Sequence, residues 1–242
     1  MRARAELTVD GAVRWRSDPP LALRPTGTSD GSQRVHLVQA AGGPLGGDDL
    51  GLAVRVGPGA RLELRTVAAT VAQPGSRPGP AHWTLEAEVT DGAHLGWCPE
   101  PTVICDGAEL RSTVAVVLRP GARALLREEV VLGRAGQRGG RFHGELTVEL
   151  EGVPLLAHTL LLDGADPALT GPAGTGAARA VGTLLVVGAG LTGPAEGAGE
   201  QPGLRWACST LAGPGRLLLA VGDVAAVATL LDHADPPDLR AG

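Results

Sequence analysis

Lysine and tyrosine are absent from this 242-residue chain, and phenylalanine occurs only once. All 21 basic residues are arginine. Without lysine the chain has neither a P-loop, whose lysine reaches the nucleotide phosphates, nor the amine of a Schiff-base enzyme. Aromatic residues make up 2% of the chain and its net charge is -5. So few stacking side chains and no basic block argue against nucleic acid as a partner.

Long hydrophobic runs are also missing. Apolar residues form 43% of the chain, enough for a core of leucine, valine and alanine, but no run approaches the length of a membrane span. Near the start, Arg2 and Arg4 are followed by Glu6 and Asp10 rather than by the apolar segment of a targeting signal. We therefore expect a cytoplasmic protein without a membrane partner.

Cysteine is scarce, and its three occurrences form no CxxC pair. Cys98, Cys105 and Cys208 fit reduced thiols better than a disulfide framework. His94, Cys98, Cys105 and Asp106 make up the one metal-like cluster, of a kind that suits zinc or nickel. In an extended strand His94 and Cys98 lie too far apart for one ion without a bend. Apolar neighbours favour core thiols instead.

Short segments with alternating apolar and polar residues dominate the first two thirds of the chain. Each ends at glycine, proline or aspartate, as half-buried strands do. The segments are 34–39, 52–56, 61–66, 83–89, 112–118, 125–132 and 145–150. The pattern predicts a mainly β body over about residues 1–162.

A repeated turn spaces these segments. Gly59 and Gly121 follow proline, and Gly92 follows aspartate. Each of the three glycines precedes alanine and a new strand. Glycine suits such turns because it accepts positive φ. Their spacing of 33 and 29 residues is typical of strands wound along one axis, although an ordinary sandwich is also compatible with it. We predict a helically wound strand assembly that is solenoid-like or sandwich-like.

The remainder, about 163–242, is rich in glycine and alanine but belongs to the same single domain. Loops around one short strand, 182–187, are expected first. Asp223 is a plausible N-cap for a C-terminal helix over 224–231, whose apolar residues share one face. A second helical turn is expected near 176–181, which gives one or two short C-terminal helices.

Signatures of catalysis are weak. VVGAGLTG at 186–193 matches GxGxxG, but the glycines and prolines that follow prevent the helix that a dinucleotide site needs. No nucleophile elbow and no HExxH spacing occur. Glu128 and Glu129 are adjacent, so that in a strand at most one of them faces inward.

Four motifs in register resemble the UreD (UreH) family of urease accessory proteins. They are GGPLGGD at 42–48, GARLELRTVA at 59–68, WCP leading into TVICDGA at 97–108, and LGR at 132–134. They span roughly residues 35–145. Cys98 and Cys105 stand at positions that are usually apolar in the family, which agrees with core thiols.

The resemblance implies a non-catalytic scaffold. It would bind apo-urease and UreF, with the GTPase UreG docked on UreF, and would bind no cofactor tightly while nickel passes to the urease active site. Weak carboxylate contacts suit an ion in transit, whereas a closed Cys/His cage would trap it. The matched motifs supply Asp48, Glu100 and Asp106 as candidate metal contacts. Ordinary turn formation is their other interpretation.

A hydrolase or isomerase on a solenoid scaffold is the alternative from another class, and a purely structural β-domain is a third. The expected pairing of histidine with carboxylates at coil interfaces is not evident, apart from His94.

Overall fold

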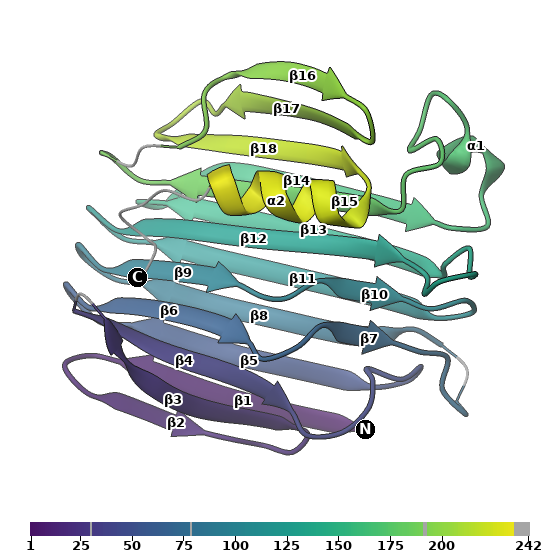
Figure 1. Cartoon of the computed structure of the whole chain (residues 1–242). Helices are drawn as coiled ribbons and strands as arrows, with labels where there is room; N and C mark the ends of the chain where they lie inside the picture. The colour runs from purple at the N-terminus through teal and green to yellow at the C-terminus, as the bar shows by residue number, and fades with distance from the viewer. Residues whose placement is uncertain (30, 78, 191–192, 235–242) are drawn as a thin grey trace.

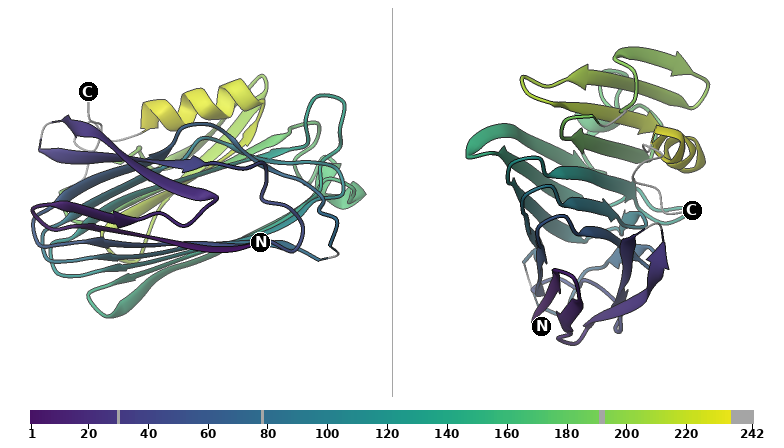
Figure 2. Two further views of the ribbon diagram at one scale, coloured as in Figure 1. Left: turned by 90° about the horizontal axis from the view of Figure 1, so that it is seen from below. Right: turned by 90° about the vertical axis from the view of Figure 1, so that its left-hand side faces the viewer.

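Two β-sheets lie face to face, and the chain winds from one to the other (Figures 1 and 2). The computed structural model describes residues 1–29, 31–77, 79–190 and 193–234. Sheet A contains, in spatial order, β14 (Val153–Asp163), β13 (Arg141–Leu150), β11 (Glu109–Leu118), β8 (Ala81–Val89), β5 (Asp49–Val56), β1 (Arg2–Val9) and β2 (Val13–Arg16).

Sheet B is the larger sheet and lies in front in Figure 1. Its spatial order is β16 (Gly197–Gln201), β17 (Leu204–Thr210), β18 (Gly215–Gly222), β15 (Ala180–Val187), β12 (Arg123–Leu132), β9 (His94–Cys98), β6 (Arg61–Thr66), β4 (Ser32–Gln39) and β3 (Leu21–Ser29). Two short strands, β7 (Thr70–Ala72) and β10 (Thr102–Ile104), extend it alongside β12.

Two successive turns of the winding, β5–β6–β7 and β8–β9–β10, repeat one pattern. A strand of sheet A ends in a glycine turn, a strand of sheet B follows, and after a break a short second strand leads back to sheet A. Neighbouring coils pair in parallel, as β5 with β8 and β6 with β9. Gly59, Gly92 and Gly121 have φ of 67°, 67° and 70°. The mainly β, solenoid-like fold predicted from the repeat is confirmed, and the seven predicted strands lie within β4, β5, β6, β8, β11, β12 and β13.

Alternation along the strands builds the core between the sheets. In β11 every second residue is buried, and Leu85 in β8 is 0% exposed. We expect Leu85→Ala to lower the free energy of unfolding by about 2–5 kcal/mol, because a cavity replaces a buried side chain. Denaturant unfolding of both proteins measures this. A loss below about 1 kcal/mol would contradict the packing.

The C-terminal helix lies on the outer face of sheet B, where α2 (Val224–Ala234) covers β15 and β18 (Figure 1). Gly182 allows this contact, since a Cβ there would lie 2.6 Å from Cγ1 of Val227. The predicted helix is confirmed. None of the helices in the described segments is long and apolar enough to cross a bilayer.

The Gly/Ala-rich segment differs from the prediction. Ala180 and Val181 are buried and begin the central strand β15, so the helical turn expected near 176–181 is wrong. A short helix, α1 (Pro167–Thr170), forms earlier, where Asp166 caps it by accepting from the amide of Ala168. Strands β16, β17 and β18 were not predicted.

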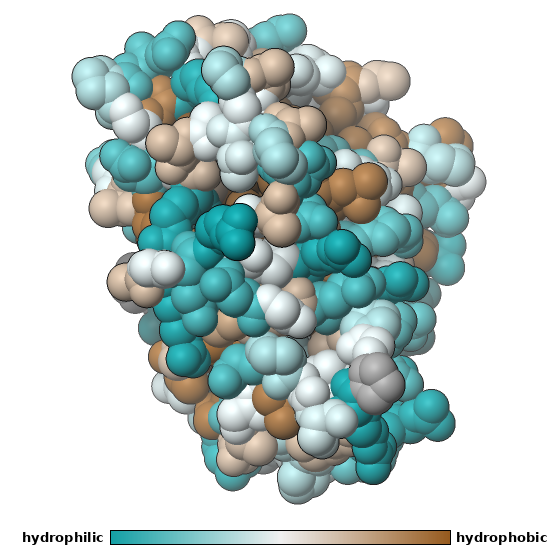
Figure 3. Space-filling view, turned by 90° about the vertical axis from the view of Figure 1, so that its right-hand side faces the viewer, coloured by the Kyte–Doolittle hydropathy of each residue, from teal (hydrophilic) through white to brown (hydrophobic). Residues whose placement is uncertain are grey.

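Hydrophilic residues dominate the middle of the face seen in Figure 3, with separate apolar patches toward its margins. This is the side at which α1 lies in Figure 1. A cavity lined by both sheets lies instead between them.

Candidate functional site

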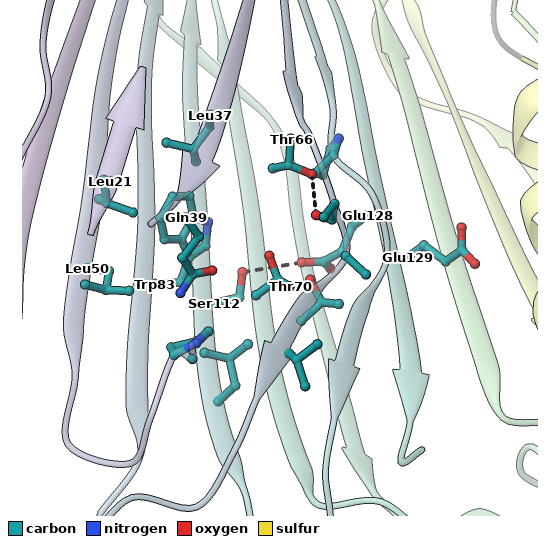
Figure 4. A pocket seen from close by; sticks show the side chains of 18 of the residues that line it. Leu21, Leu37, Gln39, Leu50, Thr66, Thr70, Trp83, Ser112, Glu128 and Glu129 are labelled. Atoms are coloured by element: carbon teal, nitrogen blue, oxygen red, sulfur yellow. Dashed lines mark hydrogen bonds between the residues drawn. The ribbon is translucent and has the colours of Figure 1, made fainter. Parts of the chain in front are cut away.

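A cavity of about 360 Å³ lies between the sheets, roughly halfway along the strands (Figure 4). Sheet A contributes Leu50, Trp83 and Ser112, which stand in one cross-strand row. Opposite them, sheet B contributes leucines, threonines, one glutamine and one inward-facing acid. These are Leu21, Leu37, Gln39, Thr66, Thr70, Thr102 and Glu128.

Breaks in sheet B explain why space remains there. Residues 67–69 interrupt β6 and β7, and residues 99–101 interrupt β9 and β10, so fewer side chains enter the core at this level. Strand β12 pairs with both β9 and β10 and passes the break between them without interruption. On sheet A, the row that contains Ser112 continues into Gly144, which has no side chain. The winding pattern itself therefore produces the cavity.

Glu128 is the acid that this cavity encloses. Its Oε1 accepts a long hydrogen bond of 3.4 Å from the hydroxyl of Ser112, and its remaining accessible surface faces the cavity. A Cβ at Gly144 would lie 3.2 Å from Oε2 of Glu128, so the glycine makes room for the carboxyl group. Burial raises the pKa of Glu128 from 4.5 to about 7, because a charge in an apolar surrounding is poorly solvated.

Its neighbour Glu129 points away from the cavity (Figure 4). It is 1% exposed, and Arg127 donates to it at 3.1 Å while also pairing with Asp232 of α2. Burial raises the pKa of Glu129 as well, against the opposing effect of Arg127. The sequence-based expectation that only one of the two glutamates faces inward is confirmed, and the inward one is Glu128.

Two further buried polar groups lie beyond Glu128. Thr183 stands directly across from it on β15, and its hydroxyl has no hydrogen-bond partner. On β14, Nε2 of His158 is likewise buried without a partner. Buried polar groups without a hydrogen-bond partner are uncommon in proteins. The polar character of the cavity therefore continues from β12 toward β14 and β15.

The donor set of the cavity suits weak contact with a hard or borderline cation. One carboxylate and several hydroxyl groups could share such an ion with water, but they form no closed set of ligands. Among the described residues lining the cavity there is no histidine and no cysteine. An ion would therefore be attracted without being held tightly.

The acids singled out from the sequence lie elsewhere. Asp48 is 6% exposed, pairs with the N-terminal amine of Met1 and accepts from the amide of Leu45 at 2.9 Å. Asp106 accepts from the amide of Gly139 at 2.6 Å. The Asp48–Leu45 contact lies within one turn, whereas the Asp106–Gly139 contact joins the turn at 105–108 to the loop at 133–140. Glu100 is exposed in the break between β9 and β10. Their role as metal contacts stays a prediction.

Asp106→Ala tests the turn role directly. We expect the free energy of unfolding to fall by about 1–3 kcal/mol, because the amide of Gly139 loses its charged acceptor. Asp106→Asn keeps an acceptor and should recover part of the loss. Thermal unfolding compares the three proteins, and equal stability of all three would exclude the turn role.

The metal-like cluster of the sequence is divided among separate parts of the core. Cys98 packs beneath α2 with Leu125 and Leu231, whereas Cys105 packs with Ile104 on the other side of sheet B. All three cysteines are buried and reduced, which confirms the prediction of core thiols. Within the described residues, no three histidine, cysteine or acidic side chains are grouped closely enough to hold a metal ion.

Glu128 was not predicted as a site residue. The sequence predicted its strand, but not that the side chain lies in a cavity between the sheets. The available signal was an acid at an inward position of β12, between the inward residues Leu126 and Val130. Alternation predicted that position, but it could not reveal the facing Ser112 and Gly144, which depend on register between distant strands.

Comparisons with known proteins agree with the motif resemblance. The family model described as UreD urease accessory protein matches residues 2–231. A protein named urease accessory protein UreD from Frankia alni is 42% identical, and the match covers 92% of this chain and 88% of that relative. A protein of the same name from Streptomyces coelicolor is also 42% identical, over 89% and 85% of the two chains. Urease accessory protein UreD 2 from Saccharopolyspora erythraea is 37% identical, over 92% and 80%. The chain described here belongs to the UreD family of urease accessory proteins.

Proposed function

We propose that this protein is a non-catalytic scaffold of urease maturation in the cytoplasm. It binds apo-urease and UreF, with UreG attached through UreF, and helps pass nickel to the urease active site. Membership of the UreD family supports the urease connection. The cavity between the sheets, with its single enclosed carboxyl group, is the observation that supports passage of an ion.

Nickel is the transported ion, and the residues that contact it in the cavity have to bind it weakly enough to release it. Glu128 attracts the ion through charge, while Ser112 and the threonines offer neutral oxygens at the same level of the fold. One carboxylate in an apolar chamber gives modest affinity because no further charged ligand adds to it. Asp48, Glu100 and Asp106 remain candidates for contacts outside the cavity, with Glu100 exposed and therefore accessible to a partner.

Hydrolysis or isomerisation is less well supported. A general acid–base mechanism needs a second positioned group beside Glu128, and the cavity supplies only hydroxyl and amide side chains next to it. The arginines and Glu129 that border the cavity belong to the opposite side of β12 or to the loop after it.

Co-expression with urease subunits, UreF and UreG, followed by affinity purification of this chain, tests the proposal. We expect urease and UreF to be recovered with it, and UreG only when UreF is present. Omitting UreF provides the control for the order of assembly. Failure to recover both urease and UreF would refute the scaffold function.

A further inference from the structure

A row of basic side chains crosses three neighbouring strands of sheet B. Arg61 on β6 and Arg123 on β12 are both direct cross-strand partners of His94 on β9. Strands β6, β9 and β12 lie side by side in Figure 1, and the row stands at their N-terminal ends. Adjacent strands are about 4.8 Å apart, so the row spans about 10 Å.

This row faces outward, away from the cavity between the sheets. The next residues on the three strands, Leu62, Leu95 and Ala124, belong to the core between the sheets. Side chains alternate along a strand, so the basic residues lie on the opposite face. Arg61 is exposed and Arg123 is partly exposed, whereas His94 is 9% exposed between them.

The charges of this row are not neutralised within the described part of the chain. No carboxylate there pairs with Arg61 or Arg123, although arginines on sheet A do have partners, as in Arg55–Glu88 and Arg141–Asp163. Nδ1 of His94 is buried and has no hydrogen-bond partner. Burial, Arg61 and Arg123 lower the pKa of His94, in that order of effect. The ring therefore lies near two positive charges that pair with no carboxylate of the described residues.

Glycines leave room over the row. Gly96 is the next outward position on β9, and a Cβ built there would find its nearest neighbour, the carbonyl oxygen of Leu62, at 3.8 Å. Arg123 rests against Gly188 and Gly190, which have no side chains to cover it. The nearest acid along β6, Glu63, is already paired with Arg34 and Arg65.

We propose that Arg61, His94 and Arg123 form a binding site for a phosphate group. Arg61 and Arg123 flank His94 on the two neighbouring strands, which places cationic donors on both sides of a single oxyanion. A planar carboxylate can be satisfied by the fork of a single guanidinium. This site lies on the outer face of sheet B and does not depend on the proposed passage of nickel.

Calorimetric titration of the full-length protein with inorganic phosphate tests the site, with glycerol phosphate and acetate as parallel titrants. We expect saturable phosphate binding that Arg61→Gln and Arg123→Gln each weaken by about tenfold or more, since a hydrogen bond between charged groups is lost. Arg55→Gln, which removes a paired arginine from sheet A, is the matched control and should bind normally. Stronger binding of inorganic phosphate than of glycerol phosphate indicates a site for the free ion, and the reverse order indicates a phosphomonoester.

A second readout does not depend on affinity alone. The ring resonances of His94, assigned by comparison with His94→Gln, should move on addition of phosphate and saturate with the same dissociation constant. Absence of saturable phosphate binding, equal binding of acetate, or equal weakening in Arg55→Gln would overturn the proposal.

Discussion

Glu128→Gln should make the protein more stable at pH 8 by on the order of 2 kcal/mol and leave its stability at pH 4 nearly unchanged. The pKa of Glu128 is raised to about 7 in the folded protein, mainly by burial. Between pH 4.5 and about 7 the folded state retains a proton that the unfolded state releases, so the free energy of unfolding falls as the pH rises. Above pH 7 the full cost of the buried charge is present.

The shift of about 2.5 between the two pKa values sets an upper limit of about 3.5 kcal/mol, because one pKa unit corresponds to about 1.4 kcal/mol. Glutamine keeps the size of the side chain and an acceptor for Ser112, but its amide is also buried, which reduces the gain. Denaturant unfolding from pH 4 to pH 8 gives both curves. Glu86→Gln removes an exposed acid from the same two-sheet body and serves as the control. Curves of wild type and Glu128→Gln that stay parallel over this range would show that the carboxyl group is not buried.

Filling the cavity should block nickel delivery without preventing assembly. Ser112 faces Glu128 and is 5% exposed, so the ring of Ser112→Phe enters the space between the sheets. We expect urease activation to fall by at least about tenfold, which corresponds to a barrier higher by about 1.4 kcal/mol. The measurement is urease activity recovered after co-expression with the accessory proteins, at equal amounts of purified complex.

Ser112→Ala is the matched control, because it removes the same hydroxyl and leaves the cavity open. Its activation should fall far less than that of Ser112→Phe, because Ser112 supplies only one of several neutral oxygens in the cavity. Overpacking can destabilise a core by about 1–3 kcal/mol, so thermal unfolding of Ser112→Phe separates misfolding from blockage. Normal activation by a folded, assembled Ser112→Phe complex would show that the ion does not pass through this cavity.

Local patterns in the sequence predicted most of the β body. Alternation located strands such as β6 and β12, and the glycines at 59, 92 and 121 located the turns between sheets. Both signals depend only on neighbouring residues, which explains their success. In contrast, β15 is buried on both faces and lies between antiparallel partners, so alternation was lost and a helical turn was wrongly expected at its start.

The candidate site was harder to predict, because it depends on contacts between distant residues. Asp48 and Asp106 stood out in motifs, yet the structure places both in turn contacts. Glu128 lay in a strand whose acids looked like a solvated face. Its burial follows from the strand registers that place Ser112 and Gly144 opposite it. Ser112 and Glu128 are 16 residues apart in the sequence. The residue pattern within a single strand does not reveal which residues of other strands face it.

Nickel content of urease, measured by mass spectrometry after reconstitution with purified accessory complexes, tests the proposed passage most directly. Complexes that carry Glu128→Gln should assemble fully but load nickel at least about tenfold more slowly than those that carry Glu86→Gln, because the only carboxylate facing the cavity interior among its described lining residues is gone. Equal loading by the two variants would contradict the account.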